Sequence, residues 1–169
     1  MIKLFISLVL LTSLAFASSD EAKPFNPEIK YIMSYDKNTT CLVRQILVHK
    51  EPRWVAKIEV RNGKVVYFSS PKAMFEFYHR PAKWFEVGVK SERDFFKIIV
   101  TDYTTQKPIN AETAFYVYGS RAISPGGDDL PAFGSKELAQ KFMKEFGGTR
   151  IFKFDKIPDA LIKLINGRI

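Results

Sequence analysis

Apolar and polar residues alternate with a period of two over residues 55–61, which predicts a half-buried β-strand. Asn62-Gly63 follows directly and predicts a two-residue hairpin turn, because both residues tolerate the positive φ that such turns require. A return strand is therefore expected over residues 64–68. The apolar stretch at residues 42–48 predicts an earlier strand.

A helix is predicted next. Ser69 or Ser70 can cap it, and Pro71 suits its first turn, where the missing N–H has no helical partner. Apolar side chains continue to residues 79–81, where the helix is expected to end. Residues 95–100 then form a strongly apolar predicted strand.

The second half repeats this plan. Its predicted elements are a strand, a Gly-rich turn, a short strand, a helix, a strand and a last helix, at residues 113–118, 124–129, 130–133, 135–146, 151–154 and 155–165. Ser135 caps the first of these helices and Gly147-Gly148 stops it. In each half a strand ending in Phe68 or Phe133 precedes a serine and a helix. We predict an α+β fold of two related strand–strand–helix–strand subdomains that share a core.

The first 17 residues predict a cleaved secretory signal. Lys3 supplies a positive start, residues 4–14 are mainly apolar, and Ala15-Phe16-Ala17 offers small residues for signal peptidase, with cleavage expected near Ala17. The apolar run is shorter than the roughly 20 residues of a permanent membrane span. No cysteine follows it to carry a lipid anchor. We expect a periplasmic or secreted mature protein with no permanent membrane span and no lipid anchor.

Length and charge limit the number of domains and the kinds of partner that the chain can have. Residues 18–40 are polar and predict an extended lead, and residues 41–169 have the length of one domain, with subdomains of about 41–103 and 104–169. The net charge of +8 and the 14% aromatic content could suit nucleic acid. Export argues against it, the basic residues are spread along the chain, and no RNP-type or helix-turn-helix pattern is present. We therefore expect no nucleic-acid partner, and a solvated basic surface suited to an acidic partner or anionic lipid.

Cys41 is the only cysteine, so an intrachain disulfide is excluded. A lone exported thiol is either buried, paired with another molecule or used as a metal ligand, and chemistry alone favours burial. No Ser–His–Asp arrangement or His-linked acidic cluster is evident. Gly126-Gly127 precedes two acids that would repel phosphate. We predict that the protein is not an enzyme and has no catalytic residue.

Asn38 begins an Asn-Thr-Thr sequence, and Asp36 stands two residues before it. Asn-x-Thr is the acceptor sequence for N-glycosylation. The acid at this offset resembles the extended acceptor of some bacterial glycosylation systems. An ordinary loop asparagine is the simpler interpretation of so short a motif, and glycosylation is the alternative.

Three segments, Tyr67–Tyr78, Thr101–Ser120 and Leu130–Asp155, resemble in order and spacing those of the NosL family of nitrous-oxide reductase accessory proteins. The resemblance extends from about Cys41 to Ile157. It implies a fold of two small strand–strand–helix–strand modules. It also implies a role in carrying Cu(I) to the copper–sulfide cluster of nitrous-oxide reductase.

The implied copper chemistry depends on sulfur, because thiolate and thioether ligands suit Cu(I). Members of the family usually begin their first strand with Cys-x-x-Cys-Gly-Met and often carry Met after Pro in the Gly-rich turn. Here Cys41 matches the first position, whereas Arg44, Ile46 and Gly126 stand at three others. Arg44 is no substitute ligand, since a guanidinium is always protonated and has no lone pair to donate.

Two soft ligands are still enough for linear Cu(I). Cys41 with Met74 is the pair we select, and Met33, His49 and His79 are the other candidate partners. Met74 also fits the apolar stripe of its predicted helix, as a core residue would. His49 suits a solvated strand end, and His79 at a helix C-terminus would complement the helix dipole.

Two functions remain open. The first is a periplasmic accessory protein of nitrous-oxide reductase maturation that resembles a Cu(I) chaperone and binds through Cys41. The alternative is a metal-free NosL-like interaction module, in which Arg44 places a positive charge where the metal's charge would lie. Expected partners are nitrous-oxide reductase or its maturation machinery, and a second, ligand-complete NosL-like protein.

Overall fold

The structure is a computed structural model that describes residues 30–167. The signal predicted for residues 1–17 and the first part of the predicted lead, residues 18–29, lie outside the described residues. Within residues 30–167, no helix is long and apolar enough to cross a bilayer.

Four antiparallel strands form the first sheet, in the order β2-β1-β3-β4. They are β1 (Ala56–Val60), β2 (Val65–Phe68), β3 (Phe95–Thr101) and β4 (Pro108–Asn110). β1 and β2 make the predicted hairpin, with Lys57 opposite Tyr67. Gly63 adopts a φ of 88° in its turn, which a residue with a side chain rarely tolerates. The β1–β3 pairing shifts register between Glu59 and Val60, which marks a bulge.

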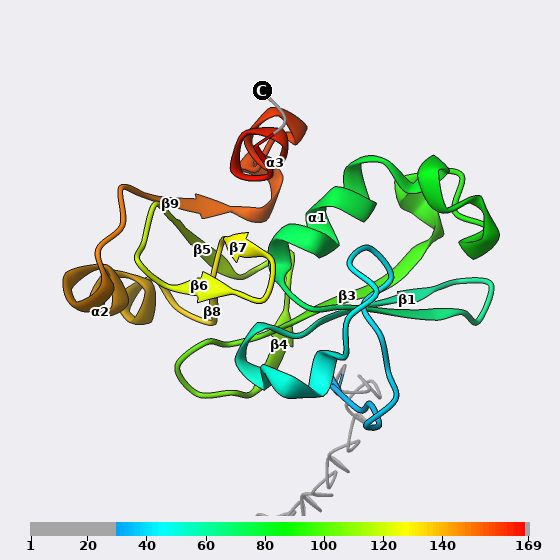
Figure 1. Cartoon of the computed structure of the whole chain (residues 1–169), viewed down its shortest axis with the longest axis horizontal. Coiled ribbons are helices and arrows are strands. Elements are labelled where there is room, and N and C mark those ends of the chain that lie inside the picture. The colour runs from blue at the N-terminus through cyan, green and yellow to red at the C-terminus, as the bar shows by residue number, and fades with distance from the viewer. Residues whose placement is uncertain (1–29, 168–169) are drawn as a thin grey trace, which may run out of the picture.

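Helix α1 (Pro71–His79) packs against β1 and β2, across one face of this sheet (Figure 1). The Ser70 hydroxyl accepts a hydrogen bond from the Ala73 N–H at 3.3 Å, so the predicted cap is confirmed. Two 3₁₀ helices, η3 (Pro81–Val87) and η4 (Glu92–Asp94), connect α1 to β3.

The second sheet has three strands in the order β8-β5-β9. The elements of this half are β5 (Phe115–Tyr118), β6 (Ile123–Ser124), β7 (Gly127–Asp128), β8 (Ala132–Phe133), α2 (Lys136–Phe146), β9 (Arg150–Lys153), η5 (Phe154–Lys156) and α3 (Asp159–Ile165). α2 packs on β5 and β8, and α3 contacts α1 (Figure 1). Ser135 caps α2 as predicted, since its hydroxyl accepts from the Leu138 N–H at 3.2 Å. β6 and β7 form a small hairpin in the Gly-rich turn.

The strand predicted over residues 42–48 is wrong. The segment closes into a tight loop, in which the Cys41 N–H donates to the Ile46 carbonyl and the Gln45 N–H donates to the Cys41 carbonyl, both at 2.8 Å. Gln45 has a φ of 57°, which lies in the left-handed region and ends any extended run. The 3₁₀ helices η1 (Val48–Lys50) and η2 (Pro52–Trp54) then lead into β1.

The last helix begins later than predicted. Residues 154–156 form a 3₁₀ turn, and α3 starts only at Asp159. Pro158 explains the break, because a proline disfavours helical φ/ψ in the residue before it, and Ile157 is extended with φ −96° and ψ 99°.

The segment Thr101–Ser120 joins the two sheets. The buried Asp102 carboxylate accepts backbone hydrogen bonds from Thr104 at 2.9 Å and Thr105 at 2.8 Å in its own turn. Its other oxygen accepts from the Gly134 N–H at 2.7 Å, just after β8. Asp102 also forms a parallel bridge with Ala132. Asp102 therefore holds both sheets together.

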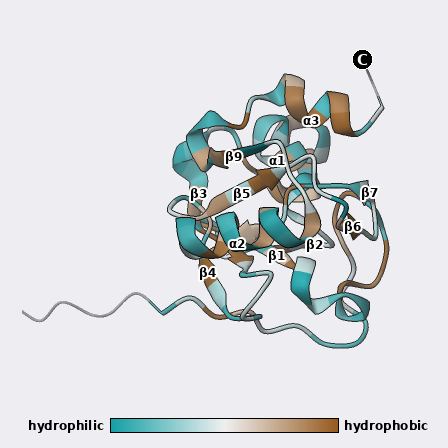
Figure 2. Cartoon of the chain, turned by 90° about the vertical axis from the view of Figure 1, so that its left-hand side faces the viewer, coloured by the Kyte–Doolittle hydropathy of each residue, from teal (hydrophilic) through white to brown (hydrophobic). Residues whose placement is uncertain are grey.

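The hydrophobic core is shared between the halves. The larger cluster contains residues of β1, β2, α1 and β3 together with Tyr116, Leu130, Phe154 and Ile162. A smaller cluster surrounds Phe142 of α2, whose outward face is hydrophilic (Figure 2). The predicted α+β class with a shared core is confirmed, and the boundary at residues 103–104 stays a prediction.

Candidate functional site

Cys41 lies in the loop before η1 and is 0% exposed. Its Sγ accepts a hydrogen bond from the Arg44 N–H at 3.3 Å. The Leu42 N–H donates to the Tyr67 carbonyl at 2.8 Å, which ties this loop to the edge of β2. Cys41 is therefore a buried, free cysteine held in a hydrogen-bonded turn.

Met74 lies on α1 and is also 0% exposed. Cys41 and Met74 belong to the same large apolar cluster, so the fold buries both predicted ligands in one core. Met33 packs on the edge of that cluster. Because both side chains are fully buried, a metal ion would reach the sulfur atoms only after a local opening of the structure.

The two histidines have other surroundings. The His79 ring lies 6.1 Å from that of Phe75, and its Nε2 donates to the Ile157 carbonyl at 2.9 Å. Burial lowers the pKa of His79, so its neutral form is favoured. His49 is half-buried on η1 rather than fully solvated, and its Nδ1 has no hydrogen-bond partner among the described residues.

The Arg44 side chain forms a polar cluster with α1 and the end of α3. One nitrogen, Nη2, lies 3.2 Å from Glu76 Oε2 and 2.5 Å from Asn166 Oδ1. The Asn166 amide in turn donates to Glu76 Oε2 at 3.1 Å. The Glu76 side chain is 3% exposed and that of Arg44 22%. A carboxylate this deeply buried needs such donors to remain charged.

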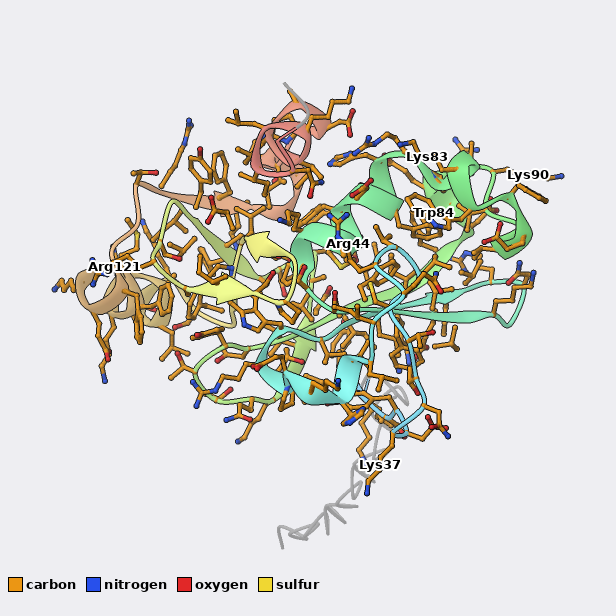
Figure 3. All side chains as sticks on the ribbon, viewed as in Figure 1. Lys37, Arg44, Lys83, Trp84, Lys90 and Arg121 are labelled. Carbon is orange, nitrogen blue, oxygen red and sulfur yellow. The ribbon has the colours of Figure 1, made fainter. Side chains whose placement is uncertain are left out.

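Gly126 lies beside this cluster. A Cβ atom at Gly126 would stand 3.5 Å from Arg44 Nε and 3.8 Å from Lys72 Cε. The Lys72 ammonium donates to the Gly126 carbonyl at 2.7 Å and to the Ile165 carbonyl at 3.3 Å. Figure 3 shows Arg44 between α1 and the β6–β7 hairpin. Two positions that the family resemblance assigns to ligands are thus neighbours in space, and a guanidinium fills the space between them.

The backbone N–H of Lys72 is bonded to a buried carboxylate, that of Asp129. Its N–H donates to Asp129 Oδ1 at 2.8 Å, and the Ser124 hydroxyl donates to Asp129 Oδ2 at 2.7 Å. Burial lowers the pKa of Lys72, although the Asp129 charge opposes the shift. Burial likewise raises the pKa of Asp129. These contacts join the Gly-rich turn to the first turn of α1.

We call the residues Arg44, Lys72, Glu76, Gly126 and Asn166 the cationic corner. Its donor atoms are nitrogen cations, an amide and one carboxylate, which do not suit Cu(I). Ile46, at the third altered position, is 37% exposed and has no donor atom. Within residues 30–167, no three His, Cys, Asp or Glu side chains are grouped so that they could hold a metal ion. The residues present therefore do not fit the usual family ligand set.

Sequence reasoning missed Lys72, Glu76 and Asn166. The sequence could have indicated Glu76, because a carboxylate between Phe75 and Phe77 in an apolar helical stripe requires a buried partner. It could not have indicated Asn166, since this residue lies 122 residues from Arg44 in sequence.

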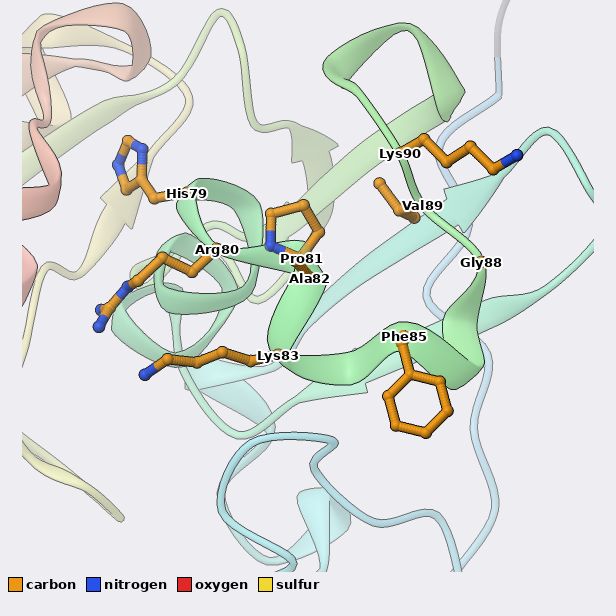
Figure 4. A pocket seen from close by; sticks show the side chains of 9 residues that line it. All are labelled: His79, Arg80, Pro81, Ala82, Lys83, Phe85, Gly88, Val89 and Lys90. Atoms are coloured by element: carbon orange, nitrogen blue, oxygen red, sulfur yellow. The ribbon is translucent and has the colours of Figure 1, made fainter.

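A cavity of about 770 Å³ lies elsewhere, beside η3. Arg80, Lys83, Phe85 and Lys90 line it, and neither Cys41 nor Arg44 does (Figure 4). Phe85 is 83% exposed. This cavity is separate from the cationic corner.

The family of the chain follows from comparison with known proteins. The NosL family model matches residues 32–162. Among solved structures, the crystal structure of the copper chaperone NosL from Shewanella denitrificans is similar, with a TM-score of 0.67 and 22% sequence identity. That match covers 79% of this chain and 99% of the other, and at this identity it shows a shared fold. No curated protein matches. With most of its length matched by the family model, the chain belongs to the NosL family.

Proposed function

We propose that this protein is a periplasmic, non-enzymatic accessory protein of nitrous-oxide reductase maturation that works without a copper site of its own. It uses the NosL scaffold to bind the maturation machinery, the reductase, or a second NosL-like protein with a complete ligand set. The observation that carries this proposal is the Arg44–Glu76–Asn166 cluster at the altered ligand positions.

Electrostatics supports the metal-free mode. The guanidinium of Arg44 and the ammonium of Lys72 both lie next to Gly126. A Cu(I) ion placed there would meet two like charges in a partly buried region, where screening is weak. Two cations, Arg44 and Lys72, stand against the one carboxylate of Glu76 in the cationic corner, which leaves it with a net positive charge. A partner that recognises a charged, metal-loaded NosL surface would find a similar charge here.

A second candidate function is Cu(I) delivery through Cys41 and Met74. It is favoured by one observation, that a free thiol and a thioether share one core cluster. In this mode copper is the cargo, and the 41–46 loop must open to load and release it.

A Cu(I) titration distinguishes the two modes. The mature protein and its Cys41→Ser variant compete with a chromophoric Cu(I) chelator under anaerobic conditions. Equal, poor competition by both proteins is the expected result. Competition by the wild type that the Cys41→Ser variant lacks would establish delivery through Cys41 and refute the metal-free mode.

A binding measurement tests the scaffold role directly. The mature protein is titrated against a ligand-complete NosL protein, in the copper-loaded and the copper-free form, and separately against the reductase and the maturation complex. A complex at micromolar concentration with at least one of them is expected. Absence of binding to all three at that concentration would contradict the scaffold role.

A further inference from the structure

The turn at residues 36–39 presents an exposed asparagine within an acceptor sequence for glycosylation. Asn38-Thr39-Thr40 is the only Asn-x-Ser/Thr sequence in the 169 residues, and Asp36 precedes the asparagine by two positions. The sequence alone does not separate this motif from an ordinary loop. Because the structure shows how the segment is folded, we propose that Asn38 of the exported protein is an acceptor for N-linked glycosylation.

The turn directs the acceptor outward. The Thr39 N–H donates to the Asp36 carbonyl at 3.3 Å, which makes Lys37 and Asn38 the two central residues of a β-turn. The Asn38 N–H donates to Asp36 Oδ1 at 2.8 Å, so the backbone of the acceptor is satisfied within the turn. Both central side chains are exposed, and Figure 3 shows Lys37 projecting from the edge of the molecule.

The Asn38 side-chain amide is free to react. Among residues 30–167 it makes no hydrogen bond, whereas the backbone on either side of it is tied down. Thr40, whose hydroxyl defines the acceptor sequence, is also exposed. Neither the amide nor this hydroxyl has to leave a partner among the described residues before a transferase binds.

The segment around the acceptor can open locally when an enzyme binds it. Residues 30–36 contain no helix or strand, although the Tyr67 hydroxyl donates to the Ser34 carbonyl and Tyr35 packs on the core cluster. After the turn, Thr40 bridges to Leu47 and the Val48 N–H donates to the Thr39 carbonyl at 3.0 Å. A segment without helix or strand opens locally at a lower free-energy cost than the core elements do. A transferase groove can therefore take hold of residues 36–40 without disturbing β1 or α1.

The Asp36 carboxylate is ionised at neutral pH. The hydrogen bonds that it accepts from the Thr39 hydroxyl and the Asn38 N–H hold its pKa below the ordinary value. A transferase with a basic residue facing this position would bind this segment more tightly than a segment that lacks the acid.

The reaction is a group transfer with no redox change. The Asn38 amide nitrogen attacks the anomeric carbon of a glycan carried on a lipid diphosphate. A carbon–nitrogen bond forms, and the carbon–oxygen bond to the diphosphate breaks with its electron pair. The amide loses one proton to a base of the oligosaccharyltransferase. The partner is therefore a periplasmic oligosaccharyltransferase, and the co-substrate is its lipid-linked glycan.

The test expresses the full precursor in bacterial cells that contain a periplasmic oligosaccharyltransferase and its lipid-linked glycan. The transferase is one that requires an acidic residue two positions before the acceptor asparagine. Identical cells without the transferase are the control. Intact mass spectrometry is expected to show a gain of one glycan mass, which peptide mapping places at Asn38. The gain is absent without the transferase and in Asn38→Gln. An unmodified protein, in cells that glycosylate a known acceptor protein, would overturn the proposal.

The adjacent threonines provide a matched pair of variants. Thr40→Ala removes the hydroxyl that the acceptor sequence needs and is expected to abolish the modification. Thr39→Ala removes the hydroxyl bonded to Asp36 but leaves the acceptor sequence intact, so the modification is expected to persist. Unfolding curves of both variants verify that each one folds. Equal modification of the two variants would refute acceptor chemistry at Asn38.

Discussion

Arg44 Nη2 and Glu76 Oε2 lie 3.2 Å apart, although 32 residues separate them in sequence. The pair connects the Cys41 loop to the middle of α1, and Asn166 extends it to the end of α3. Residues far apart in the chain thus meet at one corner, and the stability of that corner depends on charge balance.

Removing one member of this pair should destabilise the fold. Arg44→Met removes the guanidinium that lies 3.2 Å from the buried Glu76 carboxylate, and we expect a loss of about 2 to 4 kcal/mol in the free energy of unfolding. Chemical denaturation at pH 7 measures it. The double variant Arg44→Met/Glu76→Gln removes both charges and should recover most of the loss. Equal stability of the wild type and Arg44→Met would show that the ion pair contributes nothing.

Asp102 should be a second sensitive position. Asp102→Ala removes the acceptor of three backbone N–H groups, of Thr104, Thr105 and Gly134. We expect a loss of about 2 to 4 kcal/mol, reduced from the sum of the bonds because the turn is partly open to water. Asp102→Asn keeps one acceptor oxygen and should lose less. Denaturant unfolding of the three proteins checks this order.

Local sequence signals predicted part of this fold. Serine caps, the Asn62-Gly63 turn and the apolar stripes are local signals, and they placed α1, α2 and the β1–β2 hairpin. The strand prediction for residues 42–48 was wrong because a short apolar run can belong to a strand or to a loop that packs on the core. Only the hydrogen bonds of Cys41 with Ile46 and Gln45 distinguish the two.

The candidate site was predictable only in part. Cys41, Arg44 and Gly126 were found through the family resemblance. Their spatial relation to Glu76 and Asn166 was not, because each contact joins segments that approach one another only after folding. Which charge neutralises a buried carboxylate is a property of tertiary structure and leaves no periodic pattern in the sequence.

Histidine 79 should make the fold sensitive to mild acid. Burial lowers the pKa of His79 in the folded protein below its ordinary value of 6.5. Below pH 6.5 the unfolded chain therefore binds a proton that the folded protein resists, so stability falls as the pH drops from 6.5 toward the folded pKa.

The His79→Gln variant tests this effect, because its amide can still donate to the Ile157 carbonyl without titrating. Unfolding free energies of both proteins are compared between pH 7.5 and pH 5. The wild type should lose more stability than His79→Gln as the pH falls. Asp129, whose pKa is raised by burial, acts in the opposite direction but equally in both proteins. Parallel pH profiles would contradict the assignment to His79.

Cys41 should be protected from thiol reagents. Its side chain is 0% exposed, so a reagent reaches the sulfur only when the 41–46 loop opens. We expect the native protein to react at least about 100-fold more slowly than the denaturant-unfolded protein. A chromogenic disulfide reagent measures both rates. Reaction at the unfolded rate under native conditions would show that the loop opens readily, as copper loading through Cys41 would require.

Restoring soft donors at the cationic corner should restore copper binding. Arg44→Cys supplies a thiol beside Cys41, and Gly126→Met supplies a thioether whose Cβ lies where the Arg44 guanidinium now packs, 3.5 Å from Nε. Glu76→Gln accompanies them, since the buried carboxylate would otherwise lose its ion pair with Arg44. The triple variant should compete with a Cu(I) chelator at least about 100-fold better than the wild type, because two added sulfur ligands replace a repelling charge. Arg44→Cys/Glu76→Gln without Gly126→Met is the matched control and should bind less tightly. If the triple variant folds but competes no better than the wild type, the cationic corner is not what prevents copper binding in this chain.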